Sequence, residues 1–227
     1  MPQLACFTRR AIRKRWLYQR LVKSSEPTSR LIPRWCLASA VQLGVAVLAA
    51  GQSRRFGQTD KLAASFRGRP LGLHVTDTLS TLPGAHRWVI VANLEHACSS
   101  GWQEAGFTPV LNPSSERGMG SSLACAAQMA MQAGVDALLV ALADMPLVPL
   151  CHFENLRERA DSYSLRASHN GISPTPPALF GKDHFDRLAS ADGDEGARKL
   201  IRRADFIDCP ARLLVDIDDP ETLASLS

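Results

Sequence analysis

The sequence lacks a long hydrophobic run. A membrane-spanning helix needs about 20 consecutive apolar residues, but the longest apolar stretch, residues 135–142, is short and is interrupted by Asp136. The start of the chain also has no apolar segment followed by a small-residue cleavage site, as a secretory signal would have. We therefore expect no membrane partner and no secretory signal.

Paired metal-binding or disulfide motifs are also missing. The six cysteines include no C-x-x-C pair, and a chain of this size can build a core without disulfides. The six histidines show no metal-ligand spacing with one another or with the cysteines. We expect reduced, mostly buried thiols and a cytoplasmic location.

Excess positive charge is absent from most of the chain. Residues 1–40 hold nine of the 26 basic residues and one of the 22 acidic residues, so the remainder has a net charge of −4. A nucleic-acid-binding domain carries positive charge on its folded surface, so we expect no nucleic-acid partner. We assign residues 1–41 to a basic extension that is disordered or reflects a misassigned start. A functional basic arm and a targeting segment are alternatives.

Residues 42–227 read as one α/β domain. Apolar runs that predict buried strands alternate with helical patterns, which favours a mostly parallel, Rossmann-like sheet flanked by helices. Strands are predicted over 45–48, 88–92, 107–111, 137–142, 178–180 and 213–217, and helices over 70–82, 121–133, 150–160, 185–190 and 195–203. In such sheets, ligands bind beyond the carboxyl ends of the strands.

A small-residue loop follows the first predicted strand. The fingerprints G-x-G-x-x-G and G-x-x-x-x-G-K-[ST] are absent, and the loop instead reads L-A-A-G-Q-S-R-R-F-G over residues 48–57. Small residues let the backbone approach a base or a phosphate, and Gly51 and Gly57 can adopt positive φ and turn N–H groups inward. Arg54, Arg55 and Lys61 add cations, which a leaving pyrophosphate requires. The loop predicts a triphosphate site, and a basic surface turn is the alternative.

A second glycine-containing segment precedes the helix predicted over 121–133. It runs from Asn112 through Gly118 to Ser121 and Ser122, and the two serines can cap the helix. A plain helix cap would have the same appearance, so this segment supports a nucleotide site only together with the first loop.

Carboxylates follow two predicted strands. Asp144 lies in an Asp-Met-Pro turn after the strand over 137–142, where it is well placed to hold Mg²⁺. An Asp-x-Pro turn starter is the alternative. Asp216 and Asp218 would share one face of the strand predicted over 213–217. One of them, preferably Asp218, could complete a metal site with Asp144.

Together these segments resemble the MobA-like nucleotidyltransferases, in particular the molybdenum-cofactor cytidylyltransferase (MocA-like) branch. The matching patterns are L-A-A-G-x-S-x-R-x-G followed by Lys, N-P-x-x-x-x-G-[ML]-x-x-S-[LI], D-M-P, G-D-x-G-A-R at 193–198, and D-I-D-x-P at 216–220. Three residues separate Gly57 from Lys61, where the family usually has two. The resemblance covers residues 45–220, with the motifs in the family's order.

The resemblance implies a nucleotide-diphospho-sugar transferase fold, a three-layer sandwich, and a set of site residues. Arg55, Lys61 and Asp144 would be catalytic, and Asp144 and Asp218 would hold Mg²⁺. The nucleotide would be bound by Leu48, Ala49, Ala50, Gly51, Arg55, Lys61, Asn112, Gly118, Ser121 and Ser122.

The implied reaction transfers CMP from CTP to the phosphate of molybdopterin or Mo-molybdopterin and releases pyrophosphate. The product would pass to a molybdoenzyme or its chaperone. By resemblance L-A-A-G, rather than L-A-G-G, favours CTP, and Ala50 narrows the space beside the base. Two alternatives remain: a related nucleotidyltransferase that uses GTP or a sugar or alcohol phosphate, and a non-catalytic nucleotide-binding cofactor chaperone.

Overall fold

The computed structural model describes residues 41–51, 54–57, 60–82, 86–190 and 199–227. The expectations for residues 1–40 and for the G-D-x-G-A-R segment at 193–198 lie outside these residues. Within the described part of the chain, none of the helices has the length and apolar character that a bilayer crossing requires.

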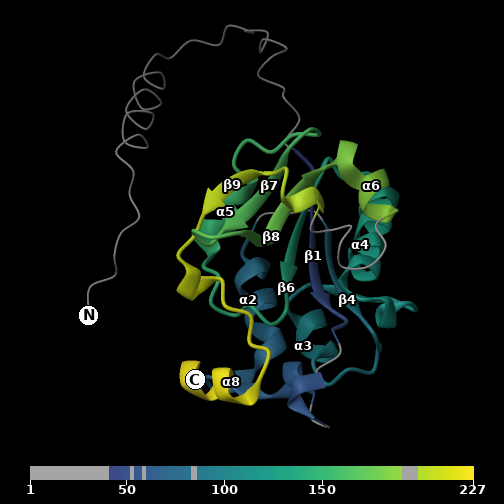
Figure 1. The fold of residues 1–227 in the computed structure, drawn as a ribbon. Helices are drawn as coiled ribbons and strands as arrows, with labels where there is room; N and C mark the ends of the chain where they lie inside the picture. Colours follow the sequence, from purple (N-terminus) through teal and green to yellow (C-terminus); the bar gives the residue numbers. More distant parts are fainter. Residues whose placement is uncertain (1–40, 52–53, 58–59, 83–85, 191–198) are drawn as a thin grey trace, which may run out of the picture. The chain divides into compact units, whose positions relative to one another are not determined.

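Seven strands form the main sheet, in the order β5-β4-β1-β6-β8-β7-β9 (Figure 1). Strands β5, β4, β1 and β6 are parallel to one another, while β8 runs antiparallel to both β6 and β7. The predicted mostly parallel sheet is therefore confirmed. The strands are β1 Leu43–Ala49, β4 His86–Val91, β5 Thr108–Leu111, β6 Ala137–Leu142, β7 Leu165–His169, β8 Pro174–Gly181 and β9 Asp205–Asp208.

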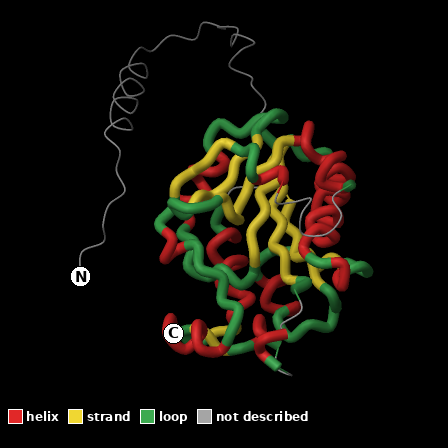
Figure 2. The backbone as a smooth tube through the Cα atoms, viewed as in Figure 1, coloured by secondary structure: helices red, strands yellow, loops and turns green. Residues whose placement is uncertain are grey.

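Helices cover both faces of the sheet, as the three-layer prediction requires (Figure 2). Alternate residues of a strand point to opposite faces, so Val45 and Val47 of β1 pack with α2 His74–Ser80, α3 Ser99–Glu104 and α5 Leu150–Arg157. Ala46 and Leu48 pack on the opposite face, with α4 Met119–Ala133 and α6 Phe185–Ala189. All seven residues of β1 are buried, which explains why its sequence is continuously apolar.

A smaller apolar cluster lies beside the carboxyl ends of the strands. It consists of Phe56, Phe66, Leu71 and Ile217. Phe56 belongs to the 3₁₀ helix η2 Arg54–Phe56, and Phe66 to a short hairpin of β2 Ser65–Phe66 and β3 Arg69–Pro70. The cluster therefore joins the first loop to the C-terminal segment.

The strand predicted over residues 213–217 is wrong. The chain forms the 3₁₀ helix η7 Ala211–Leu213, then an irregular segment, then α8 Pro220–Leu226. Ile217 is fully buried in the small cluster, and its N–H donates to the carbonyl of Asp144 at 2.9 Å. Apolar side chains in this segment therefore anchor a loop instead of a strand.

The other predicted elements match with shifted ends. The helix predicted over 70–82 begins as the 3₁₀ helix η4 Leu71–Leu73 before α2, and that predicted over 150–160 ends at Arg157. The helix predicted over 185–190 is α6, preceded by the 3₁₀ helix η6 Lys182–His184. Strands β7 and β9 and helix α3 were not predicted. Only residues 199–203 of the helix predicted over 195–203 are described.

Candidate active site

The candidate site lies at the carboxyl ends of the parallel strands. Gly51 follows β1, Asn112 follows β5, and Asp144 follows β6. The N–H of Ala143 donates to the carbonyl of Leu48 at 3.0 Å, so the segment after β6 is held against the carboxyl end of β1. Sheet order thus brings distant parts of the sequence to one edge.

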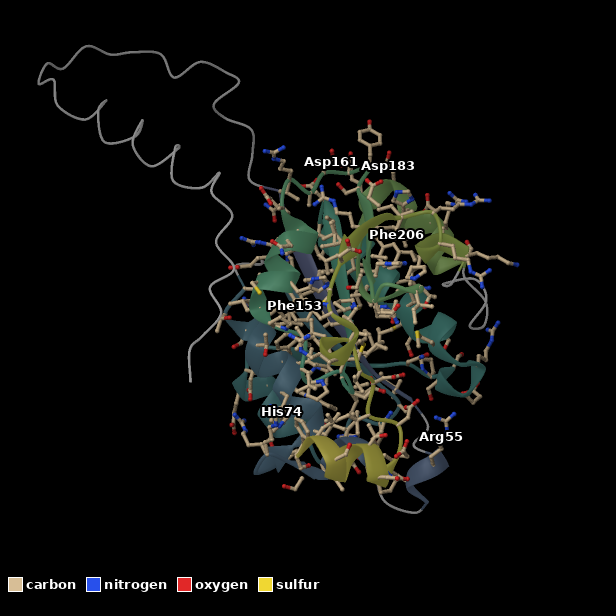
Figure 3. All side chains as sticks on the ribbon, turned by 60° about the vertical axis from the view of Figure 1, so that its left-hand side comes forward. Arg55, His74, Phe153, Asp161, Asp183 and Phe206 are labelled. Atoms are coloured by element: carbon tan, nitrogen blue, oxygen red, sulfur yellow. The ribbon has the colours of Figure 1, made fainter. Side chains whose placement is uncertain are left out.

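Lys61 connects the carboxylates at this edge. Its Nζ donates to Asp144 Oδ2 at 2.7 Å and to Asp218 Oδ1 at 2.8 Å. Arg55 Nη1 lies 3.3 Å from Asp218 Oδ2, with its side chain 72% exposed. Four of the residues singled out in the sequence therefore form one cluster of two cations and two carboxylates. In Figure 3 Arg55 lies at the end of the molecule that carries α8, opposite Asp161 and Asp183.

Burial and charge act against each other within this cluster. Burial alone would lower the pKa of Lys61, but the carboxylates of Asp144 and Asp218 outweigh it and raise that pKa. Burial raises the pKa of Asp144, and Lys61 offsets this only in part. Asp144 Oδ1 is buried without a hydrogen-bond partner. A buried carboxylate oxygen in this state is stabilised by a further cation.

Asp218 reaches Lys61 because its neighbour is anchored. Ile217 is packed in the small cluster and bonded to the backbone of Asp144, so the next residue is presented to the loop after β6. Asp216 is exposed, and the shared strand face expected for Asp216 and Asp218 is wrong. The charge of Asp216 still contributes to the raised pKa of Asp144.

A cavity of about 360 Å³ opens beside Lys61 and Asp144. Its wall includes eight residues proposed from the sequence: Leu48, Ala49, Ala50, Gly51, Lys61, Gly118, Ser122 and Asp144. Sequence reasoning missed six further lining residues: Leu62, Ser115, Glu116, Met119, Leu142 and Ala143. Five of the six lie within or directly beside the quoted motifs, so their position in the sequence was the available signal.

Asn112 and Ser121 support the cavity instead of lining it. Asn112 is buried, and its Nδ2 donates to Ser121 Oγ at 2.9 Å and to Ser122 Oγ at 3.0 Å. The expected serine cap of α4 is wrong, because Gly118 is the N-cap, at φ +89°, and Ser121 Oγ instead donates to the carbonyl of Gly118. Asn112 therefore holds the glycine loop against the start of α4.

The two glycines of the first loop, Gly51 and Gly57, have different backbone conformations. Gly57 has φ +66°, a left-handed conformation that side chains rarely adopt. Gly51 is not among the residues with positive φ, so the expected N–H turn at that position is wrong. No neighbour lies within 4 Å of a Cβ built on Gly51. Gly51 therefore faces the open space of the cavity that it lines.

Solved structures share this fold. A nucleotidyl transferase from Methanothermobacter thermautotroptrophicus matches with a TM-score of 0.66 and 19% identity, over 82% of this chain and 95% of that one. A 4-diphosphocytidyl-2C-methyl-D-erythritol synthase from Anaerococcus prevotii matches with a TM-score of 0.66 and 9% identity, over 82% and 94%. These likenesses define the class of the protein by its fold, as an α/β protein with the nucleotide-diphospho-sugar transferase fold.

The particular family follows from the sequence comparisons. Residues 45–207 match the model of the MobA-like NTP transferase domain, and the chain belongs to that family. It is 32% identical over 165 residues to the purine catabolism protein PucB of Bacillus subtilis, which covers 68% of this chain and 78% of PucB.

Two other relatives carry different names. A molybdenum cofactor guanylyltransferase of Cereibacter sphaeroides is 37% identical over 103 residues, or 45% of this chain and 50% of that protein. The nicotine blue oxidoreductase of Paenarthrobacter nicotinovorans is 30% identical over 177 residues, or 72% and 85%. Membership of the family therefore does not by itself define the nucleotide or the acceptor.

Proposed function

We propose that this protein transfers CMP from CTP to the terminal phosphate of a molybdopterin-type acceptor and releases pyrophosphate. The observation that carries the proposal is the Lys61 ammonium, which lines the cavity with Asp144 and contacts both Asp144 and Asp218. A polyphosphate needs cations and metal-binding carboxylates within reach of the same atoms. The relative named as a molybdenum cofactor guanylyltransferase supports the acceptor class.

The preference for CTP rests on the first loop. Leu48, Ala49, Ala50 and Gly51 line a cavity of about 360 Å³, which is within the usual size range of small-molecule sites. Ala50 is buried, and its methyl group narrows the wall where a glycine would leave room. A pyrimidine needs less space there than a purine does.

The residues present fit a divalent ion such as Mg²⁺. The described residues contain no cluster of three or more His, Cys, Asp or Glu side chains arranged for a metal. Mg²⁺ in nucleotide sites, however, uses one or two carboxylates together with phosphate oxygens and water. Asp144, with its buried unpaired Oδ1, and Asp218 supply that number. A related fold from Mycobacterium tuberculosis was solved with manganese, at 18% identity and TM-score 0.59 over 82% of this chain and 98% of that one.

The chemistry requires positioning and charge neutralisation. An oxygen of the acceptor phosphate attacks the α-phosphorus of CTP, a new P–O bond forms, and the bond to the β-phosphate oxygen breaks. The electron pair of that bond leaves with pyrophosphate. Arg55 and Lys61 neutralise the charge that grows on this leaving group. A bound Mg²⁺, held by Asp144 and Asp218, would add Lewis-acid stabilisation of the phosphate oxygens.

Pyrophosphate release with molybdopterin, Mg²⁺ and competing CTP, GTP and ATP tests the proposal. We expect CTP to be used in preference to the two purine nucleotides. Preference for GTP would instead assign the guanylyl reaction and overturn the cytidylyl proposal. Release of pyrophosphate only with a sugar or alcohol phosphate would overturn the proposal that the acceptor is of the molybdopterin type.

The site assignment is tested by Asp144→Ala. We expect kcat to fall by about 10²-fold or more, the scale for losing one preorganised electrostatic group. Asp183→Ala is the matched control, because Asp183 is exposed at the opposite end of the molecule (Figure 3). Undiminished pyrophosphate release by Asp144→Ala would disprove the assignment.

A further inference from the structure

The backbone beneath Lys61 is a single 3₁₀ turn, η3 Lys61–Ala63. Asp60 precedes it as the N-cap, and Asp60 Oδ1 accepts the N–H of Leu62 at 3.0 Å. Lys61 is 8% exposed, so its side chain has little freedom to correct a displaced backbone. The placement of the ammonium therefore depends on how η3 is held.

The second oxygen of Asp60 is held by His96. His96 Nε2 lies 2.6 Å from Asp60 Oδ2. His96 Nδ1 accepts the N–H of Cys98 at 3.0 Å, so Nδ1 carries a lone pair in this bond and a neutral His96 places its proton on Nε2. The ring stacks on Trp102, with centroids 4.8 Å apart. The imidazole is therefore oriented from both sides to donate to Asp60.

The same segment also holds the residue after Lys61. Cys98 Sγ donates to the carbonyl of Leu62 at 3.4 Å. Trp102, fully buried, donates from Nε1 to the carbonyl of Gly72 at 2.9 Å. A Cβ on Gly72 would lie 3.0 Å from Leu62 Cβ, so η4 and η3 pack closely there. The chain between β4 and α3 thus fixes η3 on both sides of Lys61.

We propose that His96 is a positioning residue for Lys61, acting through Asp60. His96 is not among the residues that line the cavity, and it contacts Asp60 instead of Lys61. Its hydrogen bond fixes the N-cap carboxylate, the cap fixes η3, and η3 delivers the ammonium to Asp144 and Asp218. The role rests on the proposed function, since it concerns the charge that Lys61 neutralises on the leaving pyrophosphate.

His96→Phe and His96→Gln separate this role from simple packing. Phe can still stack on Trp102 but cannot donate to Asp60, whereas the Gln amide can donate. We expect His96→Phe to lower kcat about 10-fold, which is less than the roughly 10²-fold cost of a 1 Å misplacement. The KM for CTP should change less than about threefold, because Lys61 acts mainly on the charge that develops in the transition state. His96→Gln should recover most of the loss. Equal kcat for wild type and a folded His96→Phe would overturn the inference, as would equal losses in both variants.

Two further variants serve as controls. His86 stacks on Trp88 at the opposite end of β4, so His86→Phe should leave kcat unchanged, and an equal loss there would contradict the inference. If His96→Phe does not fold, Asp60→Asn provides the same test. Its Oδ1 can still cap Leu62 while its Nδ2 faces the Nε2–H of His96, so kcat should fall. An unchanged kcat for Asp60→Asn would overturn the inference.

Lys61→Ala distinguishes a failure of the inference about His96 from a failure of the proposed function. In that background His96→Phe should change kcat by less than about twofold, because the positioned group is gone. A full additional loss would show that His96 acts elsewhere and would overturn the inference alone. A wild-type protein without pyrophosphate release, or a Lys61→Ala variant as active as wild type, would overturn the proposed function and the inference with it.

Discussion

At the scale of single residues, the site is a balanced set of charges. Arg55 and Lys61 come from the first loop, and Asp144 and Asp218 come from two later segments. Removing one partner of a partly buried pair leaves the other charge uncompensated. Each single substitution here therefore alters both the removed group and the partner that remains.

Burial also controls the reactivity of the cysteines. Burial, together with the charge of Asp60, raises the pKa of Cys98 to about 11, so its thiol stays protonated at pH 8 and reacts slowly, since the thiolate is the nucleophile. Cys151 is exposed. With iodoacetamide at pH 8, we expect alkylation of Cys151 well before Cys98, measured by peptide mass spectrometry.

Unfolding provides the control for this prediction. In denaturing urea the two cysteines should be alkylated at similar rates, because the environment that protects Cys98 is gone. Rapid alkylation of Cys98 in the native protein would contradict the buried position of its thiol.

Residue identities at strand ends were predictable, but their contacts were not. Lys61 and Asp144 could be selected because loops at the carboxyl edge carry ligands in α/β sheets, whereas Asp218 was selected beside a predicted strand that does not form. The ion pairs of Asp218 depend on Ile217, because the burial of Ile217 places Asp218 next to Lys61. No periodic pattern in the sequence predicts such an anchor. The His96–Asp60 bond joins residues 36 positions apart, and His96 lies in no recognised motif.

At the scale of elements, β8 allows the sheet to continue beyond its parallel half. It pairs antiparallel with both β6 and β7, and its last residue, Gly181, is packed against the backbone of the turn that precedes β7. A Cβ on Gly181 would lie 2.6 Å from the carbonyl oxygen of Asp161. Backbone atoms at that distance cannot move aside as a flexible side chain would.

Gly181→Ala should therefore destabilise the protein. We expect a loss of about 1–3 kcal/mol in the free energy of unfolding, the usual effect of overpacking, measured by urea denaturation. Gly51→Ala is the control, because nothing lies within 4 Å of a Cβ at that position, and its stability should equal that of wild type. Equal stability of Gly181→Ala and wild type would contradict the close packing.

The elements that sequence reasoning missed are those with weak patterns. Strand β9 has the sequence Asp-Phe-Ile-Asp, with an exposed Phe206 (Figure 3). Helix α3 buries one side chain, that of Trp102. Neither offers the repeated apolar positions from which periodicity is recognised. Buried strands such as β1 and β6 and the long helix α4 were predictable because their patterns are continuous.

At the scale of the whole molecule, a buried hydrogen-bond chain ties α5 to the antiparallel half of the sheet. His152 Nε2 lies 2.7 Å from Ser168 Oγ, and that hydroxyl donates to the carbonyl of Pro177 at 2.8 Å. The serine hydrogen is used by Pro177, so His152 is the donor in the first bond. The neutral imidazole thus links three elements in the core.

Stability should decrease in mild acid because of this histidine. Burial lowers the pKa of His152 below its ordinary value of 6.5, so the unfolded chain binds the proton more readily than the folded one. Stability is then unaffected by this group above that value and falls as the pH drops below it, by at most about 1.4 kcal/mol per pH unit. Urea unfolding between pH 5 and pH 8 measures the slope.

His152→Gln should flatten this dependence, since the amide can still donate to Ser168 but does not titrate in this range. His86→Gln, at an exposed position, is the control and should keep the wild-type slope. An unchanged slope in His152→Gln would show that other groups govern the acid response.

The overall architecture could be predicted from the alternation of strand and helix patterns. Strands β1 and β6 are recognisable because burial on both faces requires a continuous apolar sequence. The order of the last three strands did not follow. No local sequence pattern predicts that β8 lies between β6 and β7, because this strand order depends on packing across the entire sheet.

The contact of one lysine with two aspartates has a consequence for the order in which ligands arrive. Under the proposed function, a free divalent ion would compete with the tethered ammonium for Asp144 Oδ2 and Asp218 Oδ1. A nucleotide that already carries its ion offers Lys61 new anionic partners at the same moment. We therefore expect the resting protein to bind a preformed metal–nucleotide complex more readily than the metal alone.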